Sequence, residues 1–297
     1  MDELRAACAR VAERAASVRI ATERIAAYAA GLPALAPAAG ADREPPGSRE
    51  ERAAFWLTLD AINFGSGWFP TLRKPEGRSG YQTIAGGLRR RFEDAGPWSA
   101  RELADIEAAA IARVLGQDPR HELMELFAGS LRGLGARVLA QAGARFAAVA
   151  DSAGGSAVAL ALHLGGWPCF ADVSFYDGLT VPFLKRAQIA VADLHRAGVA
   201  ELADLDRLTM FADNLVPHVL RLDGVLRFDP ALVAAIERGE LIAHGSPEEV
   251  EIRACALHAV ELIVAARPGS CPAAVDQLLW NRGQEPRYKA VPRHRSR

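Results

Sequence analysis

Cysteine is scarce in this sequence, and its distribution argues against metal or redox chemistry. The four cysteines, Cys8, Cys169, Cys255 and Cys271, form no C-x-x-C pair and have no histidine at metal-ligand spacing. The seven histidines form no H-E-x-x-H box. We therefore expect reduced, mostly buried thiols, as in a cytoplasmic protein, with no metal and no cofactor.

An excess of charge and a long apolar run are also missing. Lysine and arginine total 35 against 36 aspartates and glutamates, a formal net charge of -1. Proteins that bind a nucleic acid duplex usually carry a basic excess, so we expect no such partner, whereas a small anionic ligand needs only a few local cations. Charged residues interrupt every alanine-rich stretch, and the first residues open an amphipathic helix, so we expect neither a membrane span nor a signal peptide.

The chain lacks the common catalytic motifs, and helical periodicity dominates what remains. There is no G-x-S-x-G, no Walker loop and no G-x-G-x-x-G. We expect a mainly α fold with at most a few short strands. The segment with Val173, Phe175 and Tyr176 is either a short strand or an ordered loop. Loops are expected over 31–50 and 63–80, where glycine and proline recur. Helices are expected in 1–31 and over 51–62, 79–93, 99–115, 120–147, 185–198, 247–266 and 272–282.

Helix-capping signals support two of these assignments. Ser99 with Glu102 three residues later predicts a capping box. Ser246 as N-cap, Pro247 at the first helical position and Glu249 predict a second capping box at the start of the helix that follows.

The segment LTMFADNLVPHVLR, residues 208–221, raises the question of why a carboxylate stands among apolar residues. Its apolar positions are compatible with one side of a helix-turn-helix. Asp213 is then either an N-cap that accepts backbone amides or a catalytic carboxylate at a pocket wall. In the second case Phe211 would offer an aromatic face to a flat ligand.

Four further residues carry open alternatives. Asp276 and Trp280 share a helical face, so Asp276 is either a surface residue or a ligand contact beside an aromatic wall. Lys185 and Arg186 begin a helix, where they are either solvated or converge with backbone amides on an anion. Arg253 either pairs with a glutamate four residues earlier or faces a pocket, and the spacing favours the pair.

Several motifs occur together in an order that resembles a known family. They are LDAINFGSGWF, RSGYQTI, VPFLKRAQIAVADL, LTMFADNLVPHVLR, EEVEIRACALHAVELI, VDQLLW and VPRHRSR, and they cover roughly residues 51–297. This arrangement is similar to the queuosine salvage family, the queuosine 5'-phosphate N-glycosylase/hydrolases that release queuine.

The resemblance implies a fold, an activity and a set of site residues. The fold would be helical and similar to helix-hairpin-helix DNA glycosylases, as one domain over residues 1–297 or two lobes with the pocket between them, with residues 1–50 as a variable N-terminal segment. The enzyme would hydrolyse the N-glycosidic bond of queuosine 5'-monophosphate and release queuine for salvage into tRNA modification.

The matching positions assign roles to individual residues. The catalytic carboxylate would be Asp213, and Asn281 departs from some relatives, which carry an acidic residue there. The implied substrate-binding residues are Met210, Phe211, Asp276, Gln277, Trp280, Asn281, Asn63, Phe64 and Tyr81, and the phosphate-binding cations are Lys185, Arg186 and Arg253.

Two rival functions remain at this stage. One is a glycosylase acting on a base in DNA, which the missing basic excess disfavours. The other is a non-catalytic protein that binds queuine or a nucleotide.

Overall fold

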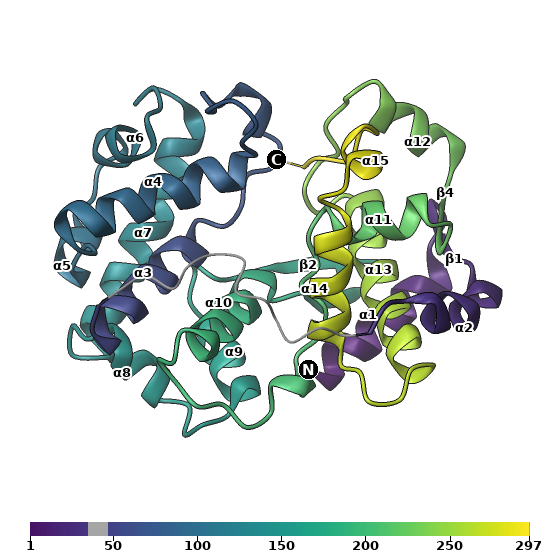
Figure 1. The fold of residues 1–297 in the computed structure, drawn as a ribbon, viewed down its shortest axis with the longest axis horizontal. Coiled ribbons are helices and arrows are strands. Elements are labelled where there is room, and N and C mark those ends of the chain that lie inside the picture. Colours follow the sequence, from purple (N-terminus) through teal and green to yellow (C-terminus); the bar gives the residue numbers. More distant parts are fainter. Residues whose placement is uncertain (35–46, 297) are drawn as a thin grey trace. The chain divides into compact units, whose positions relative to one another are not determined.

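The computed structural model describes residues 1–34 and 47–296, and this part of the chain contains fifteen α-helices and four short strands (Figure 1). The predicted mainly α fold is confirmed. The likeness to helix-hairpin-helix glycosylases stays a prediction. The chain divides into two compact units: unit 1 comprises Met1–Ala41, Asp172–Lys185 and Asp206–Arg297, and unit 2 comprises Asp42–Ala171 and Arg186–Leu205.

Unit 1 is organised around one buried helix, α13. Most of its residues are buried, including three charged ones, so it lacks the polar face of a surface helix. It packs against α1, α2, α11, α14 and the strand β1. The helices of this unit are α1 (Asp2–Arg14), α2 (Thr22–Gly31), α11 (Val216–Leu222), α12 (Pro230–Glu237), α13 (Pro247–Ala265), α14 (Pro272–Arg282) and α15 (Pro286–Lys289).

Two small antiparallel sheets complete unit 1. β1 (Val18–Ile20) pairs with β4 (Leu226–Phe228), and β2 (Val173–Tyr176) pairs with β3 (Leu179–Pro182). The β2–β3 hairpin turns at Asp177 and Gly178, both with positive φ, which is the Asp-Gly signature of a two-residue hairpin loop. The strand alternative for residues 173–176 is therefore confirmed, whereas β1 and β4 were missed because three residues are too few to display an alternating pattern.

Unit 2 is a bundle of helices around α7. This helix packs against α3, α5, α6 and α8. A side chain at Gly135 would meet the backbone of Ala104 at 2.4 Å, so glycine there lets α5 approach α7 closely. The helices are α3 (Arg49–Ala61), α4 (Gly80–Ala95), α5 (Ala100–Ala104), α6 (Ala108–Leu115), α7 (Glu122–Gln141), α8 (Phe146–Asp151), α9 (Ala157–Gly165) and α10 (Lys185–Arg196), with the 3-10 turn η1 (Phe69–Thr71).

The capping predictions hold in part. Ser99 and Glu102 form the expected capping box at the start of α5. Ser246 accepts the amide of Glu249, but the Glu249 side chain accepts from Gly245 and pairs with Arg253, so the second half of that box is wrong.

Three helix predictions need correction. Residues 99–115 form two helices rather than one, and 120–147 break at Gly143 and Ala144, whose φ angles are positive. Residues 208–215 are not helical, so the helix-turn-helix interpretation is wrong; the 3-10 turn η2 (Leu205–Arg207) ends before them and α11 begins at Val216. Most of the loop predicted over 31–50 falls on residues 35–46, outside the described residues.

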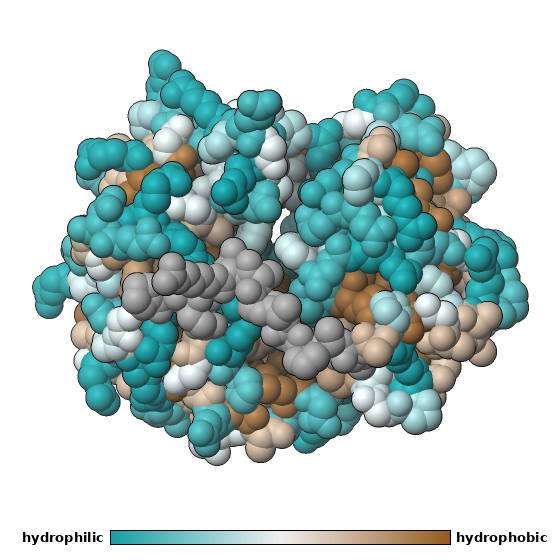
Figure 2. All heavy atoms as spheres, viewed as in Figure 1, coloured by the Kyte–Doolittle hydropathy of each residue, from teal (hydrophilic) through white to brown (hydrophobic). Residues whose placement is uncertain are grey.

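The surface is mixed in character. Hydrophilic residues cover most of the face in Figure 2, and hydrophobic ones form small separate areas. Within the described chain, every helix is too short or too polar to cross a lipid bilayer.

A buried glutamate joins distant parts of unit 1. Glu251 on α13 is 1% exposed and accepts backbone amides from Ala16 at 3.1 Å, Ser17 at 2.6 Å and Val18 at 3.0 Å. It also accepts the hydroxyl of Tyr176 at 2.8 Å. One carboxylate thus ties the start of β1 and the strand β2 to the central helix.

Replacing Glu251 with alanine should destabilise the protein by roughly 3 kcal/mol or more, because three buried amides lose their acceptor. Chemical denaturation measures this change. Glu248→Ala, at a partly exposed position in the first turn of the same helix, is the matched control and should cost no more than about 1 kcal/mol. Equal losses for the two variants would contradict this account.

Candidate active site

The segment Phe211–Ala212–Asp213 is irregular backbone that leads into α11. Asp213 is partly buried, and its Oδ1 accepts the amides of Leu215 at 2.8 Å and Val216 at 3.0 Å. The N-cap of α11 is Leu215, so Asp213 is not the N-cap residue, although one of its oxygens accepts free amides at the helix start as the capping alternative expects. Oδ2 makes no hydrogen bond to any residue that the structure describes, so these two amides fix the carboxylate and leave one oxygen for other chemistry.

Asp276 on α14 lies beside this segment. Its side chain is buried, with 5% of the residue exposed, and Oδ1 accepts the amide of Phe211 at 3.1 Å. The surface alternative for Asp276 is wrong. Burial, and then the negative charge of Asp213, raise the pKa of Asp276 well above its usual range, against smaller opposing effects of the Phe211 amide and Lys185. The protonated acid is therefore the favoured form.

Arg253 fixes the backbone directly before Asp213. It is 6% exposed, and its Nε donates to the carbonyl of Ala212 at 3.0 Å. Its terminal nitrogens donate to Asp172 at 2.6 Å and Glu249 at 3.3 Å, and its guanidinium lies 3.9 Å from the ring centroid of Phe183. The predicted pair with Glu249 is confirmed, and two carboxylates balance the charge of Arg253.

Two further basic residues belong to this part of unit 1. The amide of Lys185, at the start of α10, donates to Asp172 at 3.0 Å, and the positive charge of Lys185 partly offsets the burial that raises the pKa of Asp276. Near the C-terminus, burial lowers the pKa of the Arg293 guanidinium, and the negative charge of Asp213 partly offsets that effect. Sequence analysis did not single out Arg293, and the only signal was its place in the motif VPRHRSR.

The other predicted residues of unit 1 differ in exposure. Met210 is fully buried, while Phe211 and Trp280 are partly exposed. Gln277 and Asn281 are exposed, and their side chains hydrogen-bond to each other at 3.0 Å.

Four predicted residues lie in unit 2. Arg186 donates to the carbonyl of Ala61 at 2.7 Å, and its guanidinium lies 4.9 Å from the ring centroid of Phe64. Asn63 is next to Phe64, just after α3, so these three residues gather at the end of that helix. Tyr81, partly exposed, lies in the first turn of α4.

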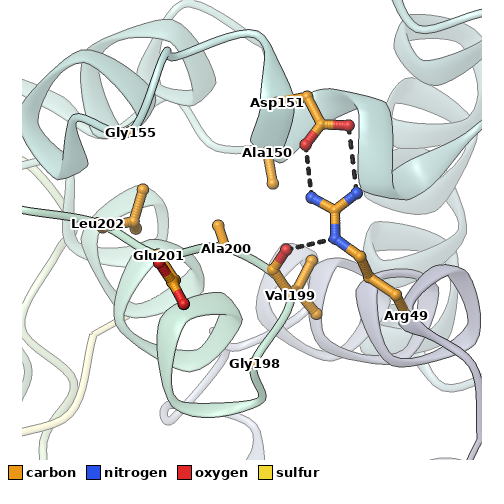
Figure 3. Close-up of a pocket in the computed structure, with 9 residues that line it drawn as sticks. All are labelled: Arg49, Ala150, Asp151, Gly155, Gly198, Val199, Ala200, Glu201 and Leu202. Atoms are coloured by element: carbon orange, nitrogen blue, oxygen red, sulfur yellow. Dashed lines mark hydrogen bonds and ion pairs between the residues drawn. The ribbon is translucent and has the colours of Figure 1, made fainter.

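A cavity of about 390 Å³ lies elsewhere in unit 2 (Figure 3). Arg49 there is paired through two hydrogen bonds with Asp151 and donates to the carbonyl of Val199 at 2.6 Å. Its cation is therefore already neutralised, and no predicted site residue lines this cavity. Among residues 1–34 and 47–296, no three His, Cys, Asp or Glu side chains form a group that could hold a metal ion.

The arrangement around Asp213 is suited to acid and carboxylate chemistry. Asp213 is held by amides at the helix start and has one oxygen without a hydrogen bond to the described residues, while the burial of its neighbour Asp276 favours the protonated acid. Two carboxyl groups in unlike environments are a common basis for dividing catalytic roles.

Comparison with known proteins identifies a family for this chain. The family model described as queuosine salvage protein matches residues 44–297. A protein from Sphaerobacter thermophilus is 38% identical over 84% of this chain and 81% of its own length. Relatives from Mus musculus and Bos taurus are 28% and 30% identical, over 85% and 74% of this chain and 83% and 71% of their own lengths.

All three relatives carry the name queuosine 5'-phosphate N-glycosylase/hydrolase. The family match spans every predicted site residue, including the two neighbouring carboxyl groups. The chain belongs to the queuosine salvage protein family.

Proposed function

We propose that this protein is an N-glycosidase that hydrolyses queuosine 5'-monophosphate to queuine and ribose 5-phosphate, so that queuine returns to tRNA modification. The names of the relatives support the reaction. The structural observation that supports this reaction is a pair of neighbouring carboxyl groups, Asp213, which is partly exposed, and Asp276, which is buried.

Asp213 is the proposed catalytic carboxylate. Cleavage of an N-glycosidic bond builds positive charge on C1' of the ribose, and a carboxylate stabilises that charge or attacks the carbon. A well-placed group of this kind accounts for roughly 3–4 kcal/mol of the barrier. The two amides on Oδ1 orient the side chain, and Oδ2 then faces C1'.

Asp276 is the proposed partner of the leaving base. A 7-deazapurine has carbon in place of N7, so the usual site for protonating a departing purine is absent. Hydrogen bonds to the polar edge of the base must help it leave. A buried carboxylic acid that keeps its proton is a donor for this purpose.

The remaining site residues are proposed from the resemblance. Phe211 and Trp280 would stack on the base, while Met210, Gln277 and Asn281 would complete the contacts of unit 1. Asn63, Phe64 and Tyr81 of unit 2 are proposed substrate contacts. Lys185, Arg186 and Arg253 are the proposed phosphate cations, although the hydrogen bonds of Arg253 to Asp172 and Glu249 favour a structural contribution.

Asp213→Asn should fold normally, because the amide oxygen still accepts from Leu215 and Val216, and should lose about 100-fold or more in turnover. The assay follows free queuine from queuosine 5'-monophosphate by mass spectrometry. Asp206→Asn, an exposed neighbour in the sequence, is the matched control and should keep full activity.

Two outcomes of this assay would contradict the proposal. Near-normal turnover by Asp213→Asn would remove Asp213 from the mechanism. Binding of queuine without any release of base from the nucleotide would indicate a carrier rather than an enzyme.

Removing the 5'-phosphate from the substrate should reduce kcat/KM, because binding energy at a remote anion orients the sugar for reaction. Steady-state kinetics with queuosine and queuosine 5'-monophosphate measure the difference. Equal kcat/KM values for the two substrates would contradict the proposal that the protein binds the 5'-phosphate.

The pH profile should reveal the proton on Asp276. The group is protonated below its raised pKa, so kcat/KM should fall on the alkaline side as that proton is lost. Asp276→Asn cannot ionise and should lose this decline, and Asp276→Ala should reduce kcat/KM by roughly 10-fold or more. An unchanged alkaline decline in Asp276→Asn would assign it to another group.

A further inference from the structure

The C-terminal segment of unit 1 brings an arginine to Asp213. The side chain of Asn214 donates to the carbonyl of His294 at 3.3 Å, which joins the residue after Asp213 to the residue after Arg293. Arg221 holds the carbonyl of Pro292 at 3.2 Å, and the carbonyl of Arg295 accepts the amide of Ile242 at 2.9 Å. The backbone on both sides of Arg293 is therefore fixed.

The side chain of Arg293 differs from those of its basic neighbours. Arg221 and Arg295 each donate to a backbone carbonyl, of Pro292 and Gly239 respectively. Arg293 makes no hydrogen bond or ion pair with any residue in the described part of the chain, although it is partly buried. Burial lowers the pKa of its guanidinium, and the charge of Asp213 opposes that effect.

A partly buried guanidinium whose N–H donors have no acceptor destabilises the protein when no ligand is bound. Transfer of a charged group out of water is unfavourable unless a partner satisfies it. Arg293 retains its N–H donors in a planar arrangement that suits two oxygens of one phosphate group. The nearby charges of Arg295 and Arg221 add to the local positive field, and His294 stays neutral because burial lowers its pKa to about 3. These features favour an anionic ligand.

The chemistry of the substrate matches this position. In ribose 5-phosphate, C1' and C4' are both bonded to the ring oxygen, and C4' carries the phosphate ester through C5'. The phosphate therefore lies no further than one sugar from a carboxylate that acts at C1'. We propose that Arg293 is a specificity-determining residue that binds the 5'-phosphate of the nucleotide, an inference that rests on the proposed function for the identity of the sugar.

Binding of ribose 5-phosphate, measured by isothermal titration calorimetry, tests this role without requiring catalysis. Arg293→Met keeps the length of the apolar stem and should weaken binding roughly 10- to 100-fold. Arg293→Lys keeps the charge without the planar pair of donors and should recover part of the loss. Arg295→Met is the matched control, two residues away; it removes a neighbouring charge but no proposed phosphate contact, so it should weaken binding by no more than about 3-fold.

Thermal stability separates ligand binding from a structural role. Removal of a shielded, unsatisfied cation should leave the Tm of Arg293→Met unchanged or raised, whereas loss of a structural residue would reduce it. In kinetics, Arg293→Met should lose the preference for queuosine 5'-monophosphate over queuosine.

Three results would overturn the assignment of Arg293. These are equal ribose 5-phosphate binding by the Arg293→Met and Arg295→Met variants, no saturable binding by the unaltered protein, or equal kinetic losses for both substrates with a shifted pH profile. The last result would mean that Arg293 acts through Asp213. If the unaltered protein binds ribose 5-phosphate but releases no queuine, the proposed function fails while the assignment of Arg293 stands.

Discussion

The hydrogen bond from the Phe211 amide to Asp276 is the contact on which the candidate site depends. It joins the irregular segment before α11 to the buried face of α14. Through it a carboxyl group removed from solvent lies beside the segment that carries Asp213. Because burial penalises the charged form, the environment of Asp276 favours the protonated acid. The proposed division of catalytic roles between the two aspartates rests on this difference in burial.

Buried charged residues around this contact fix the backbone next to Asp213. Arg253 is surrounded by Asp172, Glu249 and the carbonyl of Ala212, a set that costs desolvation and need not stabilise the fold more than apolar residues would. Its effect is to fix Ala212, between the amide held by Asp276 and the side chain of Asp213. Adjacent backbone groups are thus held from two helices, which limits the positions that Asp213 can adopt.

Local patterns were enough to predict much of the fold. The Ser99 capping box, the strand before Asp177–Gly178 and the pair between Arg253 and Glu249 each depend on residues at most four apart. The family motifs identified Asp213 and Asp276 as candidates. Such features could be found because their physical cause lies within one turn or one helix.

Other features could not be found in this way. The burial of Asp276 depends on packing against a segment 65 residues away, and its spacing to Trp280 was equally compatible with a surface position. Residues 208–215 have apolar positions at helical spacing, yet tertiary hydrogen bonds hold them in an irregular path. The approach of Arg293 to Asp213 likewise depends on where whole elements pack.

The proton on Asp276 is the most direct measure of the central claim. Infrared difference spectroscopy between the unaltered protein and Asp276→Asn at neutral pH detects the carbonyl band of a protonated carboxylic acid. The account predicts that this band is present in the unaltered protein and absent in the variant. Loss of a carboxylate band instead would mean that Asp276 is ionised, which would contradict the account.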